Sequence, residues 1–150
     1  MSEEPGAQSR ASYAFWTKEK VRFGDVDRND HVNNVVLAEY CENARVEFRE
    51  AVLEGSSADP GFTWFVVSFA ITYHAPLDYP GVAEIGTRVA EIGRSSFTMG
   101  HAIFSGERCI ATATSKIVCV DRATQKGREL PAHYRQALET SLKGSGRHGA

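Results

Sequence analysis

The spacing of apolar residues changes along this chain from a period near 3.6 to a period near 2. Over residues 35–53, apolar side chains recur every three or four positions and carboxylates fill the other side, which predicts an amphipathic helix of about five turns. Asn33 or Asn34 is placed to cap its start, and Gly55 is placed to end it. Before the helix, residues 15–23 alternate as a strand does, most clearly near their ends.

After the helix the chain has the alternation and composition of strands. Residues 64–73 are largely apolar on both faces, which predicts a central strand covered on both sides. Further strands are predicted at 82–92, 95–105 and 107–120, and a short helix is predicted at 132–142. This terminal helix begins directly after Pro131, a residue common at helix starts.

This order of elements predicts an α+β domain. An antiparallel five-stranded sheet curled around the long helix fits it, because one sheet face must bury the apolar stripe of the helix. The small residues Ala111, Ala113 and Ser115 would let the helix lie close to the sheet. Such a sheet leaves an edge that needs cover, so we expect a homodimer or a homotetramer.

Composition narrows the class of protein. With 150 residues, 42% apolar and 24% charged, the chain predicts one globular domain at 13–142. Residues 1–12 and 143–150 are small, polar and rich in glycine, so we expect flexible tails. No apolar stretch approaches the roughly 20 residues of a membrane span, and no secretory signal is present, so we expect a cytoplasmic protein.

Net charge and cysteine spacing argue against a nucleic-acid-binding protein and against a zinc site. A net charge of −2 gives no overall attraction to nucleic acid. The three cysteines lack the spacing of a zinc site, and we expect reduced packing residues at Cys41, Cys109 and Cys119. No metal or cofactor is predicted.

The residues best suited to chemistry lie in the segment GDVDRNDHVNN, residues 24–34, directly before the long helix. It holds three carboxylates, three carboxamides and a histidine in eleven residues. The first N–H groups of a helix have no partner within the helix and carry partial positive charge, so they can polarise a carbonyl oxygen. A carboxylate a few residues upstream can attack a substrate or activate water.

Several segments together resemble the hot-dog-fold thioesterases of the 4-hydroxybenzoyl-CoA thioesterase type. The resemblance covers about residues 17–137 and includes the loop just described, YHAPLDYPG, GRSSF and the helix residues Tyr40, Glu42, Ala44 and Arg45. The alternation of Asp27, Asn29 and His31 is also similar to plant acyl-carrier-protein thioesterases. The resemblance implies a hot-dog fold and thioester hydrolysis.

The resemblance also implies roles for particular residues. Asp27 would be the catalytic carboxylate, as nucleophile or as the base for water, and the backbone N–H near Asn34 would polarise the thioester carbonyl. Asn29 and His31 would orient Asp27, the water or the substrate, although His31 could instead cap or hydrogen-bond the loop. Asp25 is expected to bind backbone amides of its own loop. A thiol of pKa about 8.5 leaves without a strong general acid.

Two positions depart from the family pattern. Asp30 stands where the bacterial members frequently have glycine, and Leu37 stands where they often have tyrosine. Coenzyme A binding is matched by Arg94 before Ser96 and Phe97. The strongest basic cluster elsewhere, which could also be a solvated turn, contains Arg122, Lys126 and Arg128.

The leading hypothesis is therefore an acyl-CoA thioesterase whose sites form at a dimer interface, with the acyl chain entering beside the long helix. Its candidate lining residues, which could also be plain core, are Tyr40, Trp64, Phe65 and Phe69. One alternative is a thioesterase acting on acyl carrier protein, an acidic partner that the basic cluster would dock. The other is a module that binds acyl thioesters without cleaving them.

Overall fold

The computed structural model describes residues 6–54 and 61–148, and five antiparallel strands form its sheet. In the order β1-β3-β4-β5-β2 across the sheet, the strands are β1 (Phe15–Lys20), β3 (Val82–Ile92), β4 (Ser96–Ser105), β5 (Arg108–Asp121) and β2 (Phe62–Tyr73). The helices are α1 (Asn34–Phe48), which continues into the wider turn η3 (Arg49–Glu54), and α2 (Ala132–His148). Two short turns, η1 (Arg10–Ser12) and η2 (Phe23–Asp25), flank β1.

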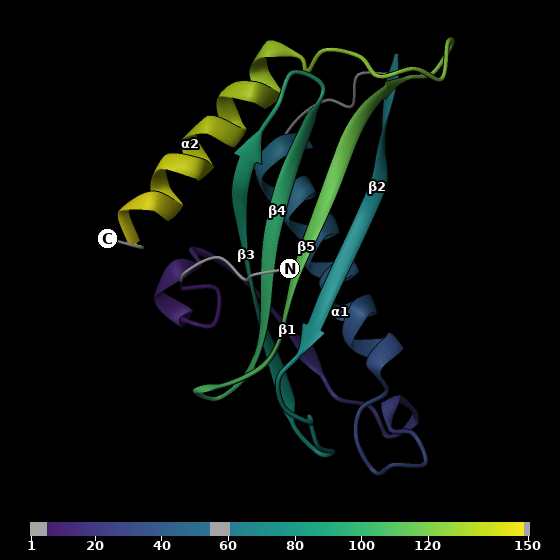
Figure 1. The fold of residues 1–150 in the computed structure, drawn as a ribbon, viewed down its shortest axis with the longest axis vertical. Coiled ribbons are helices and arrows are strands. Elements are labelled where there is room, and N and C mark those ends of the chain that lie inside the picture. The colour runs from purple at the N-terminus through teal and green to yellow at the C-terminus, as the bar shows by residue number, and fades with distance from the viewer. Residues whose placement is uncertain (1–5, 55–60, 149–150) are drawn as a thin grey trace.

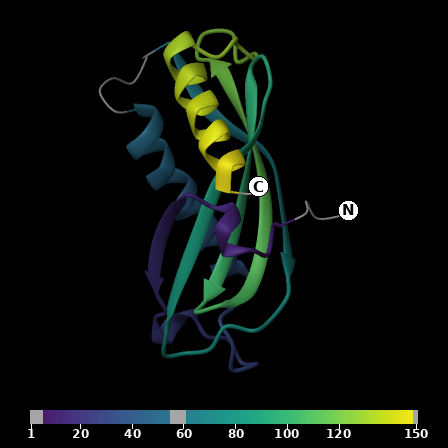
Figure 2. The ribbon, with the colours of Figure 1, turned by 90° about the vertical axis from the view of Figure 1, so that its left-hand side faces the viewer.

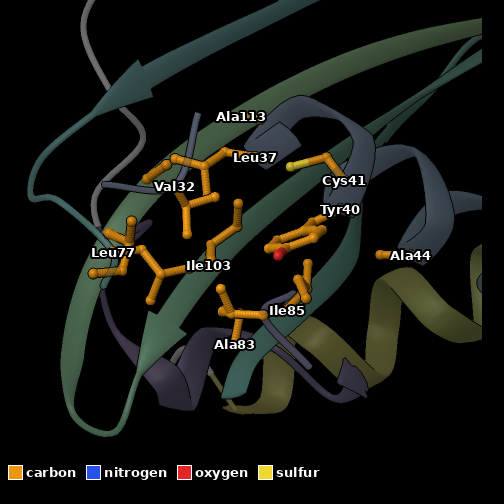
Figure 3. Close-up of a cluster of buried hydrophobic side chains, with 13 residues drawn as sticks. Val32, Leu37, Tyr40, Cys41, Ala44, Leu77, Ala83, Ile85, Ile103 and Ala113 are labelled. Carbon is orange, nitrogen blue, oxygen red and sulfur yellow. The ribbon is translucent and has the colours of Figure 1, made fainter. Parts of the chain in front are cut away.

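Both long helices pack on one face of the sheet (Figures 1 and 2). Near its start, α1 turns Leu37, Tyr40, Cys41 and Ala44 toward Ile85, Ile103 and Ala113 of the sheet (Figure 3). At the other end of the sheet, Phe48 and Leu53 join Tyr134 and Leu138 of α2 in a second buried cluster. The predicted architecture, a five-stranded antiparallel sheet around one long helix with a terminal helix, is confirmed.

The predicted small-residue face of β5 lies under α1. Ala111 and Ala113 are buried in the same cluster as Cys41 and Ala44, so the helix backbone can approach the sheet closely. Ser115 is buried too, but it has a polar role, because its Oγ lies 2.9 Å from Nε2 of His101.

His101 is fully buried inside the sheet face that the helices cover. Its Nδ1 lies 3.2 Å from the Thr87 hydroxyl, so both ring nitrogens have a hydroxyl partner. Burial, with a smaller contribution from the positive charge of Arg45, lowers the pKa of His101 to about 3. The imidazole is therefore uncharged at neutral pH.

The strand predicted to be central, β2, lies at the edge of the sheet, so this prediction is wrong. A β-bulge between Val66 and Ser68 also changes which side chains share a face. Trp64 packs with the helix-side core, and so does Phe69, five residues later, whereas simple alternation places them on opposite faces. An apolar run on both faces is typical of a buried central strand, but an edge strand covered by another molecule has the same pattern.

Several predicted boundaries differ from those of the structure. The first strand ends at Lys20 rather than at residue 23, and α2 runs through His148, past the predicted end at 142. Residues 6–12, expected within a flexible tail, contact the rest of the molecule: the guanidinium of Arg10 lies 4.4 Å from the Trp16 ring, and Ala7 is buried. The predicted end of α1 at Gly55 lies outside the described residues. The domain boundaries as a whole stay a prediction.

The three cysteines are free thiols, as predicted. Burial raises the pKa of Cys41 to about 12, which leaves it an inert packing residue. Across residues 6–54 and 61–148, no helix has the length and apolar character that a membrane crossing requires.

Candidate active site at the start of α1

The loop before α1 is folded back on itself by short-range backbone contacts. Val26 and Val32 form an antiparallel bridge, and the Asp27 N–H donates to the His31 carbonyl at 3.0 Å. The Asp30 N–H donates to the Asp27 carbonyl at 3.1 Å. Asp30 has a φ of 63°, the left-handed region that glycine adopts most easily. Glycine, which the resemblance associates with this position, would adopt this backbone conformation without strain.

Asp27 is held by one oxygen of its carboxylate. Its Oδ1 accepts the Asn29 N–H at 2.8 Å, a short-range contact by which an aspartate stabilises its own loop. Within the part of the chain that the structure describes, Oδ2 has no hydrogen-bond donor. The side chain is thus oriented through one oxygen while the second remains available to a substrate or to water.

The first turn of α1, seven residues after Asp27 in the chain, leaves one amide available. Asn33 is the N-cap, and its Oδ1 accepts the Val35 N–H at 2.9 Å. The Asn33 carbonyl accepts from Val36 and Leu37. Among the described residues the Asn34 N–H has no acceptor, and its carbonyl accepts from the Tyr73 hydroxyl at 3.0 Å. An N–H in this position can polarise a carbonyl oxygen, as the sequence predicts.

Asp25 anchors the loop to the core rather than facing the site. Its Oδ2 accepts the Tyr40 hydroxyl at 2.8 Å and the Arg22 N–H at 2.9 Å. The Asp25 carbonyl accepts the Asn33 N–H at 2.8 Å. Burial, followed by the hydrogen bond to Asp25, raises the pKa of the Tyr40 hydroxyl. Both observations agree with the structural role expected for Asp25, and they place Tyr40 in the core.

His31 has a partner that the sequence did not indicate. Its Nδ1 lies 3.0 Å from Oδ1 of Asp78, in the connection between β2 and β3. Asp78 is 47 residues from His31 in the chain, so no local pattern relates them. Asp78 lies in the segment YHAPLDYPG, whose only signal in the sequence is its resemblance to the family.

Two cavities follow α1 on the side of the edge strand β2. They have volumes of about 360 Å³ and 430 Å³, and both are lined by Glu42, Arg45 and Val66. Phe69 lines the first and Trp64 the second, as two of the four predicted lining residues. Burial lowers the pKa of Arg45, which lines both cavities, and Arg49 also lines the larger one. The other two predicted lining residues, Tyr40 and Phe65, line neither cavity.

The predicted coenzyme A residues lie at the opposite end of the sheet from Asp27 (Figure 1). They lie in or beside two short connections, one between β3 and β4 and the other between β5 and α2. These connections contact each other, because the Leu130 N–H donates to the Arg94 carbonyl at 3.0 Å. Arg122 donates to the Phe62 carbonyl, and the Arg128 guanidinium lies 5.7 Å from the Phe62 ring. β4 separates the two ends by about 30 Å, at 3.3 Å per residue. Within one chain, therefore, the predicted catalytic residues are not brought together with Arg94, Ser96, Arg122, Lys126 and Arg128.

Over residues 6–54 and 61–148, no three His, Cys, Asp or Glu residues are grouped as a metal site requires. The candidate site is therefore a carboxylate, a histidine and a helix amide within eight consecutive residues.

Comparison with known proteins places this chain in a family. The family model described as the thioesterase-like superfamily matches residues 21–138. Over 137 residues the chain is 27% identical to the long-chain acyl-CoA thioesterase FadM of Escherichia coli, covering 85% of this chain and 98% of the relative. It is 25% identical over 133 residues to the 1,4-dihydroxy-2-naphthoyl-CoA hydrolase of Nostoc punctiforme, covering 87% and 90%.

Solved structures show the same fold. The PA5185 protein of Pseudomonas aeruginosa matches with a TM-score of 0.78 at 27% identity, over 88% of this chain and 94% of that one. A 1,4-dihydroxy-2-naphthoyl-CoA thioesterase from Synechocystis matches with a TM-score of 0.74 at 18% identity, over 83% and 94%. At this lower identity the similarity concerns the fold alone.

Proposed function

This chain belongs to the thioesterase-like superfamily, and from that premise we propose that it hydrolyses acyl-CoA thioesters to a free acid and coenzyme A. Two relatives that match most of the chain carry the names of acyl-CoA hydrolases. The observation that carries the proposal is that one Asp27 oxygen and the Asn34 N–H, at the two ends of the loop that leads into α1, both remain available. Ester-type hydrolysis needs a nucleophile or base and a group that stabilises the oxyanion, and these two supply both.

The proposed reaction begins when the thioester carbonyl oxygen accepts the Asn34 N–H. In the general-base form, the Asp27 carboxylate takes one proton from a water molecule while the water oxygen bonds to the acyl carbon. The carbonyl electrons move to the oxygen near the helix start, whose partial positive charge stabilises them. The C–S bond then breaks, and the coenzyme A sulfur leaves with the electron pair as a thiolate. In the nucleophilic form, an Asp27 oxygen bonds to the acyl carbon, and the C–S bond breaks as the thiolate leaves with the electron pair. Water then hydrolyses the resulting anhydride to the free acid and the Asp27 carboxylate.

A second copy of the chain would complete this site, as expected of a homodimer or homotetramer. β2 is an edge strand with unusual apolar exposure: Phe65 is 58% exposed, and Val66 and Val67 are exposed as well. Such an edge needs a covering partner. Antiparallel pairing of β2 with its copy about a two-fold axis reverses the ends of the partner sheet. The basic connection of one copy, residues 121–128, would then lie at the same end as Asp27 of the other.

This arrangement supports roles for the predicted coenzyme A residues across the subunit boundary. The phosphates of coenzyme A would bind the basic connection, which carries Arg122, Lys126 and Arg128. The turn with Arg94 and Ser96 lies beside this connection. The cavities beside α1, lined by Trp64 and Phe69, would take the acyl group. A cytoplasmic location stays a prediction.

The test is release of free thiol from a panel of acyl-CoAs by the wild type and by Asp27→Asn. Asparagine keeps an acceptor for the Asn29 N–H, so the loop should keep its fold while the base or nucleophile is lost. We expect a loss of about 10²–10⁴-fold in kcat, the usual contribution of a general base. Asp30→Asn, which alters an exposed carboxylate of the same loop, is the matched control and should retain activity.

Equal thiol release by the wild type and Asp27→Asn, or none by either, would contradict the proposal. Binding of acyl-CoA without release is the result expected of a non-catalytic module. Parallel assays with acyl-carrier-protein thioesters distinguish the remaining alternative, in which the basic connection docks that acidic partner.

A further inference from the structure

The connection between β2 and β3 contacts the loop before α1, residues 24–34, and the start of the turn η2 through consecutive residues. The Val32 N–H donates to the Leu77 carbonyl at 2.8 Å. Two residues later, the Tyr79 ring packs edge-on against Phe23, with ring centres 5.7 Å apart and an interplanar angle of 75°. These two contacts bracket Asp78, one with the loop at Val32 and the other with η2 at Phe23. The position of Asp78 relative to His31 is therefore set by the fold.

The contact between Asp78 and His31 determines which nitrogen of the imidazole carries a proton. Nδ1 of His31 lies 3.0 Å from Oδ1 of Asp78, which is hydrogen-bond distance. An ionised carboxylate only accepts hydrogen bonds, so the imidazole nitrogen must be the donor. When the imidazole is uncharged, a proton on Nδ1 leaves Nε2 as an acceptor.

We propose that Asp78 is a positioning residue of the hydrolytic site, which acts by holding His31 with Nδ1–H toward its carboxylate and Nε2 free to accept a hydrogen bond. The inference rests on the proposed function. In the general-base reaction, one proton of the attacking water goes to Asp27, and Nε2 of His31 accepts a hydrogen bond from the other O–H. Such an acceptor fixes the direction of the water lone pair that bonds to the acyl carbon.

The exposure of His31 and Asp78 indicates whether removal of the Asp78 carboxylate should affect folding stability or the orientation of the imidazole. The side chains of His31 and Asp78 are 46% and 67% exposed, and ion pairs this accessible to water contribute little to stability. Removing the Asp78 carboxylate should therefore leave folding nearly unchanged while the imidazole loses its orientation. A purely structural role for Asp78 would give the opposite result.

The first experiment reads the histidine directly and requires no activity. Nitrogen NMR of ¹⁵N-labelled protein distinguishes the two uncharged tautomers of a histidine. The spectra are recorded above neutral pH, where an ordinary histidine is uncharged. The His31 signals are assigned by their loss in His31→Gln. In the wild type we expect the Nδ1–H form. In Asp78→Ala we expect a shift toward the Nε2–H form, which an unconstrained imidazole prefers. The matched control is Glu107→Ala, at an exposed carboxylate in the turn between β4 and β5. Identical His31 signals in the wild type and Asp78→Ala would overturn the inference.

The second experiment is a double-mutant cycle on thioester hydrolysis. Asp78→Ala should lower kcat on the order of tenfold, less than the 10²–10⁴-fold contribution of a general base, and should change KM little. If Asp78 acts through His31, Asp78→Ala should have no further effect in the His31→Gln background. Independent, multiplying losses would overturn the inference. Absence of activity in the wild type would contradict the proposed function, and the NMR experiment would still test the pair.

Discussion

Acidification should destabilise this protein through His101, the fully buried histidine between the hydroxyls of Thr87 and Ser115. The folded state holds His101 uncharged, because burial lowers its pKa from 6.5 to about 3. In the unfolded chain the imidazole regains its ordinary pKa and binds a proton below about pH 6.5. The unfolded state then binds more protons than the folded state. Stability therefore falls as the pH decreases from about 6.5 toward 3.

The size of the effect follows from proton linkage. With pKa values of 6.5 unfolded and about 3 folded, the free energy of unfolding should decrease by about 2 kcal/mol between about pH 7 and pH 5. This figure is insensitive to the folded pKa, because any value well below 5 leaves the folded imidazole uncharged at pH 5. It depends on the unfolded pKa, which is that of an ordinary histidine.

The assay is urea denaturation of the wild type and His101→Gln at both pH values and at one protein concentration. Other titrating groups, including the remaining histidines, occur in both proteins, so their contributions cancel when the two pH dependences are subtracted. The wild type should lose about 2 kcal/mol more than His101→Gln between the two pH values. Equal pH dependences would show that His101 is protonated in the folded state or accessible to water, and would refute this reasoning.

Two further predictions concern packing and thiol chemistry. In Gly86→Ala the new Cβ would lie 2.6 Å from Cγ of Tyr13, so we expect a loss of about 1–3 kcal/mol in chemical denaturation; Gly24→Ala, with nothing within 4 Å, is the control. A similar loss in both variants would contradict the packing argument. Native alkylation followed by mass spectrometry should modify only the partly exposed Cys109, whereas the two buried thiols should react after unfolding. More than one adduct on the native protein would contradict that burial.

Much of the candidate site could be predicted because its residues are neighbours in the chain. Asp27, Asn29, His31 and Asn34 lie within eight positions, so a tight turn followed by a helix start brings them together. The available N–H of Asn34 follows from the general property that a first helical turn lacks partners. Asp78 could not be predicted to join them, because its contact with His31 depends on where the connection after β2 passes.

The amino-acid pattern by itself determined the kinds of element and their order, since a period of 3.6 or 2 is written in local side-chain spacing. β3 begins and ends at the predicted residues 82 and 92. Only the tertiary structure decided that β2 lies at the edge, that its bulge exchanges faces, and that the basic connection stands at the end of the sheet opposite Asp27. The physical reason is that pairing order and close approach arise from backbone hydrogen bonds and packing between distant segments. These interactions leave no periodic trace in the sequence of either segment.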